Sequence, residues 1–180
     1  MSEHAERFIE YLKTLKEKDR GAMATLRHSL AFESGAYPKA FPYVERFAGS
    51  SLHERDARRL ALYAVAGLFA RHPMQRPQRF AASLGELMRG RESPSIEQRF
   101  VALLGADAEN IMEYLRQAVS LLAADSIGFD YARLLDDLTI WMDLGPAVDP
   151  TRRDHLRQRW ARDFYRALQA ETEPKTTIAE

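Results

Sequence analysis

The sequence predicts an all-α protein, with an N-terminal helical part followed by a C-terminal antiparallel four-helix bundle. Apolar residues recur at helical spacing along nearly the whole chain, and the long apolar–polar alternation that is typical of strands does not occur. The 180 residues suffice for one domain, or for two small helical halves that share a core. A hydrophobic share of 46% and a charged share of 29% are typical of globular proteins and exclude wholesale disorder.

The N-terminal helical part is predicted to span residues 1–92. Apolar stripes predict helices over residues 4–17, 53–71 and 80–89, and Asp19 is expected to cap a short helix between the first two. The second half of the longest helix is apolar on nearly all sides, which indicates deep burial, and the helix is expected to end at His72 because proline follows. Residues 33–50 contain two glycines and two prolines, so we expect a loop with one short turn.

The C-terminal four-helix bundle is predicted to span residues 93–168, after a boundary near Gly90. A Ser-x-x-Gln pattern that begins at Ser95 matches a capping box and predicts a helix start at Ile96. Three aspartates are expected to cap the next three helices: Asp107, Asp130 and Asp149, the last followed by Pro150. Residues 169–180 are polar and lack an apolar stripe, which predicts a flexible tail.

The sequence carries few signs of catalytic chemistry. The absence of cysteine excludes disulfide scaffolds, cysteine-based metal sites and thiol nucleophiles, and no phosphate-binding glycine loop or nucleophile elbow occurs. The histidine spacing matches no common metal motif. We therefore expect no catalytic residue, no cofactor and no metal. A metal-dependent bundle enzyme that uses the acidic residues of 107–143 is the least favoured alternative.

Some acidic and aromatic residues are expected to have structural roles. Asp136 and Asp137 are expected to lie on a solvated face or to meet an arginine of a neighbouring helix. Trp141 and Trp160 lie on apolar stripes and are expected in the core rather than on a base-stacking surface. Tyr131 lies in the first turn of its helix, where a half-exposed side chain is expected.

Charge is balanced overall but unevenly distributed. The 26 basic and 26 acidic residues give no net charge, which argues against a protein that binds nucleic acid strongly on its own. However, 21 of the basic residues are arginine, whose forked guanidinium suits phosphate, although a GC-rich genome would also favour arginine codons. Residues 55–99 hold nine arginines and four acids, whereas residues 107–143 hold eight acids and two arginines. Local fields therefore matter more than the total.

The last helix is expected to carry a row of arginines on its polar face: Arg152, Arg159, Arg162 and Arg166. The row is about 20 Å long at a rise of 1.5 Å per residue. It could follow a nucleic-acid backbone, or it could pair with the acids of residues 107–143. Arg152 and Arg153 lie in the first turn, where cations oppose the helix dipole, and this favours a functional reading.

Five segments together resemble one known family: DRGAMATLRHSL (19–30), SLGELMRG (83–90), SIEQRFVALLGAD (95–107), YLRQAVSLLAADSIGFDYARLLDDLTIW (114–141) and RQRWARDFY (157–165). In this order and spacing they look like the CasB family, the small subunit of the type I-E CRISPR Cascade complex. The resemblance covers residues 5–168. It implies an all-α fold without catalytic activity, whose members act as a pair along an RNA-guided complex and hold the guide RNA–target DNA hybrid and the displaced strand in basic grooves.

The resemblance also implies which residues contact nucleic acid. By position it assigns this role to Arg27, Arg99, Arg116, Arg152 and Arg153. Charge clustering adds Arg20, Arg58, Arg59, Arg89, Arg91 and Arg157, with Arg89 and Arg91 expected in a loop around Gly90. No role is assigned to residues 31–52 or to the tail.

The implied partners are the other Cascade subunits, a second copy of the chain, the guide RNA, and the target and displaced DNA strands. No membrane is expected, because the longest uncharged run, Leu60–Ala70, is too short to span a bilayer. The acidic N-terminus does not resemble a signal peptide, so a cytoplasmic location is expected. The alternative function is a helical protein–protein adaptor without nucleic-acid contact, whose arginines bind acidic protein surfaces.

Overall fold

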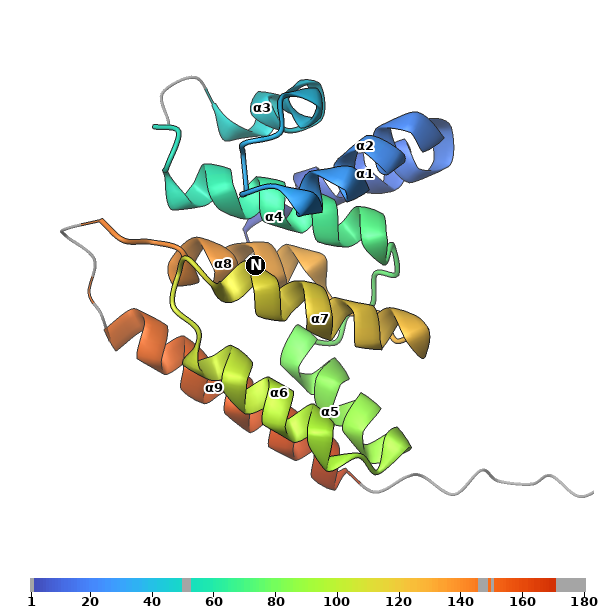
Figure 1. The fold of residues 1–180 in the computed structure, drawn as a ribbon, viewed down its shortest axis with the longest axis vertical. Coiled ribbons are helices and arrows are strands. Elements are labelled where there is room, and N and C mark those ends of the chain that lie inside the picture. The colour runs from blue at the N-terminus through green and yellow to red at the C-terminus, as the bar shows by residue number, and fades with distance from the viewer. Residues whose placement is uncertain (1, 50–52, 146–148, 150, 171–180) are drawn as a thin grey trace, which may run out of the picture.

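The computed structural model describes residues 2–49, 53–145, 149 and 151–170, and this part of the chain is built of helices (Figure 1). The α-helices are α1 (Glu3–Lys18), α2 (Arg20–His28), α3 (Phe41–Ala48), α4 (Ala57–Arg71), α5 (Phe80–Arg91), α6 (Pro94–Gly105), α7 (Ile111–Ala124), α8 (Tyr131–Trp141) and α9 (Thr151–Gln169). Two short 3₁₀ helices, η1 (Ser29–Ala31) and η2 (Pro38–Ala40), lie between α2 and α3. The all-α prediction is confirmed.

The helices lie in three tiers, with α1 to α4 in the upper tier of Figure 1, α7 and α8 in the middle, and α5, α6 and α9 below. The most extensive helix–helix contacts are those of α5 with α9 and of α4 with α8. Both contacts join helices from the two sides of residue 92, and one hydrophobic core runs through both parts. The division of the chain at residues 92 and 93 stays a prediction. Gln169, the first residue of the predicted tail, ends helix α9, and residues 171–180 lie outside the described residues.

Helix α4 occupies the centre, as its apolar sequence predicts. Every residue from Ala61 to Ala70 is buried, because α4 packs against α2 and α3 on one side and against α7 and α8 on the other. It ends at Arg71, as expected from the proline after His72. None of the helices in the described ranges is both long and apolar enough to cross a lipid bilayer.

Three of the predicted caps are present. The Asp19 side chain accepts from the amide of Ala22, and Asp130 accepts from the amides that begin α8. Asp149 accepts from the amide of Thr151 at 2.9 Å, while Pro150 lies outside the described residues. These side chains satisfy amides that have no partner within their own helix.

Three predicted helix starts are wrong. Helix α4 begins at Ala57, after the N-cap Asp56, and not at residue 53. Asp107 accepts from Glu109 and Asn110 in a turn, and α7 begins four residues later, at Ile111. Helix α6 begins at Pro94 and not at Ile96, because proline fits the first turn and needs no amide partner there. The residue that was expected to form the capping box therefore lies inside the helix.

Two further expectations are corrected by the structure. Residues 33–50 contain helix α3, since Pro42 occupies the first turn and Val44 and Ala48 are buried. Helix α5 continues through Gly90 and ends at Arg91, and Glu92 follows with a φ of 49°, so Arg89 and Arg91 lie in its last turn rather than in a loop.

Of the three predictions about aromatic residues, two are confirmed and one is wrong. Trp141 and Trp160 are buried in the core, as predicted. Tyr131 is fully buried rather than half exposed, because its ring packs between Phe69 and Phe129. Its hydroxyl finds a partner in the main-chain oxygen of His72, 2.5 Å away, and burial raises its pKa well above the ordinary value.

Candidate nucleic-acid interface

Three arginines from three different helices lie side by side and form what we call the arginine cluster: Arg27 of α2, Arg71 of α4 and Arg116 of α7. Arg27 Nε donates to the carbonyl of Ala70 at 3.1 Å, and Arg71 Nε donates to Ser120 Oγ at 2.8 Å. A terminal nitrogen of Arg116 donates to the carbonyl of Leu30, the residue one turn after Arg27. The contacts thus link α2 to α4, α4 to α7, and α7 to η1, the 3₁₀ helix that directly follows α2.

The charge of the arginine cluster is not compensated by these contacts. All three acceptors are neutral oxygens, and within the described ranges none of the three guanidinium groups forms an ion pair. A guanidinium has five N–H donors, so each of them keeps most of its hydrogen-bonding capacity. Arg27 and Arg71 are exposed and Arg116 is half-buried. The cluster is therefore suited to an anionic ligand.

Arg116 also lines a groove of about 1510 Å³. Its walls come from residues 30–36, 53–60, 108–116 and 139–145 and from the start of α9. Five arginines line it: Arg55, Arg58, Arg59, Arg116 and Arg152. Six carboxylates line it as well: Glu33, Glu54, Asp56, Glu109, Glu113 and Asp143. The groove as a whole is not basic. Within the described ranges Arg55, Arg116 and Arg152 line it without an ion pair, and Arg116 belongs to both the groove and the arginine cluster.

Arg58 and Arg59 lie together in the groove but differ in availability. Arg58 is 64% exposed and pairs with Asp56 at 2.9 Å, and this hydrogen bonding lowers the pKa of the Asp56 carboxyl. Arg59 is only 12% exposed. It donates to Glu45 Oε1 at 2.5 Å and to the carbonyl of Glu54 at 3.0 Å, and its guanidinium lies over the ring of Tyr63. Arg59 therefore holds the groove wall in place.

Glu45 is the carboxylate that anchors Arg59. Burial alone would raise its pKa, but hydrogen bonds from Tyr63 and Arg59 outweigh burial, and the pKa is lowered. The Tyr63 hydroxyl donates to the same oxygen at 2.5 Å, and its own pKa is raised by burial and by that contact. The three side chains form one charged network beneath the groove.

Four other predicted arginines are engaged elsewhere in the fold. Arg89 donates to the carbonyls of Ala167 and Ala170 at the end of α9, and Arg153 donates to the carbonyl of Asp143. Carbonyls at a helix C-terminus lack partners in their own helix, so Arg89 satisfies a structural need.

The remaining two of these four arginines form ion pairs. Arg91 pairs with Asp125, and Arg157 pairs with Asp154 while it donates to the carbonyl of Ala106. None of the four lines the groove. By contrast, Arg20 and Arg99 are exposed, and the described part of the chain offers neither of them an ion pair, but both lie outside the groove.

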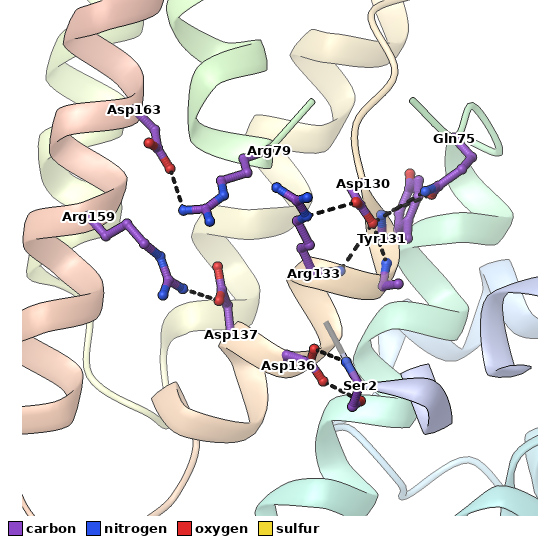
Figure 2. Close-up of polar contacts among 11 residues, drawn as sticks. Ser2, Gln75, Arg79, Asp130, Tyr131, Arg133, Asp136, Asp137, Arg159 and Asp163 are labelled. Carbon is purple, nitrogen blue, oxygen red and sulfur yellow. Dashed lines mark hydrogen bonds and ion pairs between the residues drawn. The ribbon is translucent and has the colours of Figure 1, made fainter. Parts of the chain in front are cut away.

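The arginine row on α9 is interrupted. Arg159 pairs with Asp137 of α8 (Figure 2). Trp160 Nε1 donates to the other oxygen of the same carboxylate at 2.7 Å. Burial raises the pKa of Asp137, although the bonds from Trp160 and Arg159 oppose this effect. One helical turn further on, Asp163 pairs with Arg79 at 3.3 Å. At Arg159 the expected alternative, pairing with an acid of residues 107–143, is confirmed.

Two site residues were missed by the sequence reasoning. Arg71 belongs to the arginine cluster and Arg55 lines the groove, but both lie within an arginine-rich segment where local pattern singles out neither. Arg71 ends an apolar helix, and only the packing of α4 on α7 brings it to Ser120.

The fold and the site define a class of protein: an all-helical scaffold that presents arginines from several helices beside a groove. Among the described residues no group of three or more His, Cys, Asp or Glu side chains could hold a metal ion. A model of the CRISPR-associated protein Cse2 family matches residues 22–165, and the chain belongs to this family. The predicted resemblance to CasB is confirmed.

Individual relatives agree with this assignment. The chain is 42% identical over 179 residues to the CRISPR-associated protein Cse2 of Thermus thermophilus, with 96% of each protein covered. It is similar to the crystal structure of a Cse2-family protein from the same organism (TM-score 0.76, 43% identity, 92% and 99% of the two chains). It is also similar to the crystal structure of M. ruber CasB (TM-score 0.74, 30% identity, 93% and 96%). A chain of a CRISPR RNA-guided surveillance complex shares the fold at 23% identity (TM-score 0.75, 92% and 93%).

Proposed function

We propose that this chain is a non-catalytic small subunit of a CRISPR RNA-guided surveillance complex of the Cascade type. In this role it binds the guide RNA–target DNA hybrid and the displaced strand, and so stabilises the R-loop in antiviral defence. The proposed partners are the other subunits, a second copy of the chain, the guide RNA and the two DNA strands, in the cytoplasm. Membership of the Cse2 family supports the assembly, and the arginine cluster, bonded only to neutral oxygens, supports the nucleic-acid contact.

The proposed mechanism is electrostatic. Exchange of a DNA duplex for an RNA–DNA hybrid is nearly balanced in free energy, so contacts between protein and backbone can tip it. Each guanidinium that meets a phosphate releases counterions and adds affinity without sequence preference. The guanidinium groups of the arginine cluster are already held in place by main-chain and hydroxyl oxygens, so less side-chain entropy is lost on binding.

The test replaces Arg27 and Arg116 by alanine in the reconstituted surveillance complex. We expect weaker binding of target DNA for every target sequence, and a plot of log affinity against log salt whose slope is less steep by about 2. The matched control is Arg162→Ala with Arg166→Ala, which removes two exposed α9 arginines that belong neither to the arginine cluster nor to the groove. Circular dichroism and co-purification check that both variants fold and assemble.

Two outcomes would contradict the proposal. If the slope and the affinity of the Arg27→Ala, Arg116→Ala complex equal those of wild type, the arginine cluster does not bind backbone. If the same substitutions instead abolish assembly, and the free, folded wild-type chain binds no nucleic acid, the adaptor function is favoured, since acidic protein surfaces would then be the ligands.

A further inference from the structure

The segment between α2 and α3 carries an exposed aromatic ring beside the arginine cluster. Phe32 is 46% exposed and lines the groove. It lies two residues after Leu30, whose carbonyl accepts from Arg116. Of the described Phe, Tyr and Trp residues, only Phe32 and Tyr165 are exposed, and Tyr165 lies outside the groove.

The Phe32 ring is fixed by other aromatic rings rather than by the core. Tyr37 stacks on it with ring centroids 4.7 Å apart and an angle of 14° between the planes. The imidazole of His28 meets both rings edge-on, 5.6 Å from Phe32 and 5.2 Å from Tyr37. Tyr37 supports one side of the ring, so Phe32 is held as a flat apolar surface at the groove wall.

A turn over residues 33–36 allows Tyr37 to stack on Phe32. Gly35 has a φ of 81°, which L side chains rarely adopt, and the turn that contains it brings Tyr37 back onto Phe32. A Cβ at Gly35 would lie 2.6 Å from a guanidinium nitrogen of Arg59. Because Arg59 is in turn anchored by Glu45, the aromatic pair is tied to α4 and α3.

We propose that Phe32 is a stacking platform for an unpaired nucleobase of a single nucleic-acid strand, whose phosphates lie along the arginine cluster. The inference rests on the proposed function and assigns a role to Phe32, which lies in a segment for which the sequence assigned none. An aromatic ring next to uncompensated guanidinium groups is the combination that binds single strands, since every base has an apolar face and every nucleotide a phosphate. A paired base keeps its neighbours in the duplex and gains nothing from the ring.

The test measures binding of the full-length chain, at low salt, to a single-stranded DNA, to the RNA of the same sequence and to the corresponding DNA duplex. We expect Phe32→Ala to weaken single-strand binding about 5- to 100-fold, without change in the salt slope, because stacking releases no counterions. Phe32→Trp is expected to keep wild-type affinity and Phe32→Leu to lose it, since an aliphatic side chain does not stack. Duplex binding is expected to stay unchanged.

The control protein is Tyr165→Ala, which removes the other exposed aromatic ring and is expected to leave single-strand binding unchanged. The control ligand is a strand whose central nucleotides are abasic. Wild type should bind it more weakly than the normal strand, and Phe32→Ala should bind it as wild type does. Comparison of the affinities for single-stranded DNA and for RNA shows whether the displaced DNA strand or the guide RNA is the better ligand.

The outcomes separate this inference from the proposed function. If wild type binds single strands and Phe32→Ala binds them equally well, or if the substitution weakens duplex binding as much, the platform is wrong and the proposed function stands. If neither the chain nor its assembled complex binds any strand, the proposed function fails and the platform with it. If Phe32→Ala prevents assembly but not strand binding, the platform is wrong and Phe32 contacts a protein subunit.

Discussion

At the scale of single residues, the acceptor decides what an arginine does. Arg116 donates to a neutral carbonyl and keeps its charge available, whereas Arg59 is enclosed by Glu45 and the ring of Tyr63. The two residues look alike in the sequence, because each is an arginine on a helix near apolar neighbours. Six of the eleven predicted arginines bond to carboxylates or to main-chain carbonyls away from the arginine cluster, and their contact with nucleic acid stays a prediction.

Glu45 makes a pH dependence testable at this scale. Its pKa is lower in the folded protein than its ordinary value, so the folded state binds this proton less tightly than the unfolded chain. The Glu45 carboxylate therefore stabilises the fold at neutral pH, and the stabilisation is lost as pH falls through the folded-state pKa. We expect the free energy of unfolding of wild type to exceed that of Glu45→Gln at pH 7, and the difference to shrink only once the pH falls below the unfolded-state pKa of glutamate, about 4.3. Urea unfolding over a pH series measures this, and parallel curves for the two proteins would contradict it.

At the scale of helices, the predictions were correct where a sequence pattern allowed only one structural interpretation. The apolar run of α4 allows only a central position, and an aspartate before an apolar stripe marked the starts of α2 and α8. Proline was harder to read, because it breaks helices in their interior and favours their first turn. Pro42 and Pro94 both act in the second way, which is why α3 was missed and α6 begins earlier than expected.

The contact between α5 and α9 gives a prediction at the scale of helices. A Cβ on Gly85 would overlap the main-chain oxygen of Phe164, so the two helices approach closely only because residue 85 has no side chain. We expect Gly85→Ala to reduce the free energy of unfolding by about 3 kcal/mol or more, because backbone must move. The matched control in the same helix is Gly90→Ala, which meets no atom within 4 Å and should be neutral or slightly stabilising. Thermal unfolding compares the two, and equal melting temperatures would show that the helices separate without cost.

At the scale of the whole molecule, the site is a product of packing. The residues of the arginine cluster lie more than forty positions apart in the sequence and meet because α4 packs against both α2 and α7. The aromatic platform likewise depends on Gly35, Arg59 and Glu45, which come from three separate elements. Local pattern describes one element at a time, so it could propose the arginines of this site but not their grouping.

The balanced charge of the molecule predicts how it behaves alone and in an assembly. With no net charge the isolated chain gains little from long-range attraction, so we expect weak binding of single-stranded DNA that disappears as salt rises. Within a surveillance complex the contacts become intramolecular, and removal of this chain should weaken target binding roughly 10- to 100-fold. Mobility-shift titrations of the isolated chain and of complexes with and without it measure both effects. Tight, salt-resistant binding by the isolated chain would contradict this view.

The amino-acid sequence by itself determined the all-α class, the central helix, most helix ends and the family, because these follow from periodicity, caps and the order of motifs along the chain. Only the tertiary structure decided which arginines remain available, which of them lie together, and that Phe32 stands exposed beside them. The physical reason is that a guanidinium is neutralised or left free by its neighbours in space. Those neighbours are set by the packing of helices whose residues are distant in the sequence.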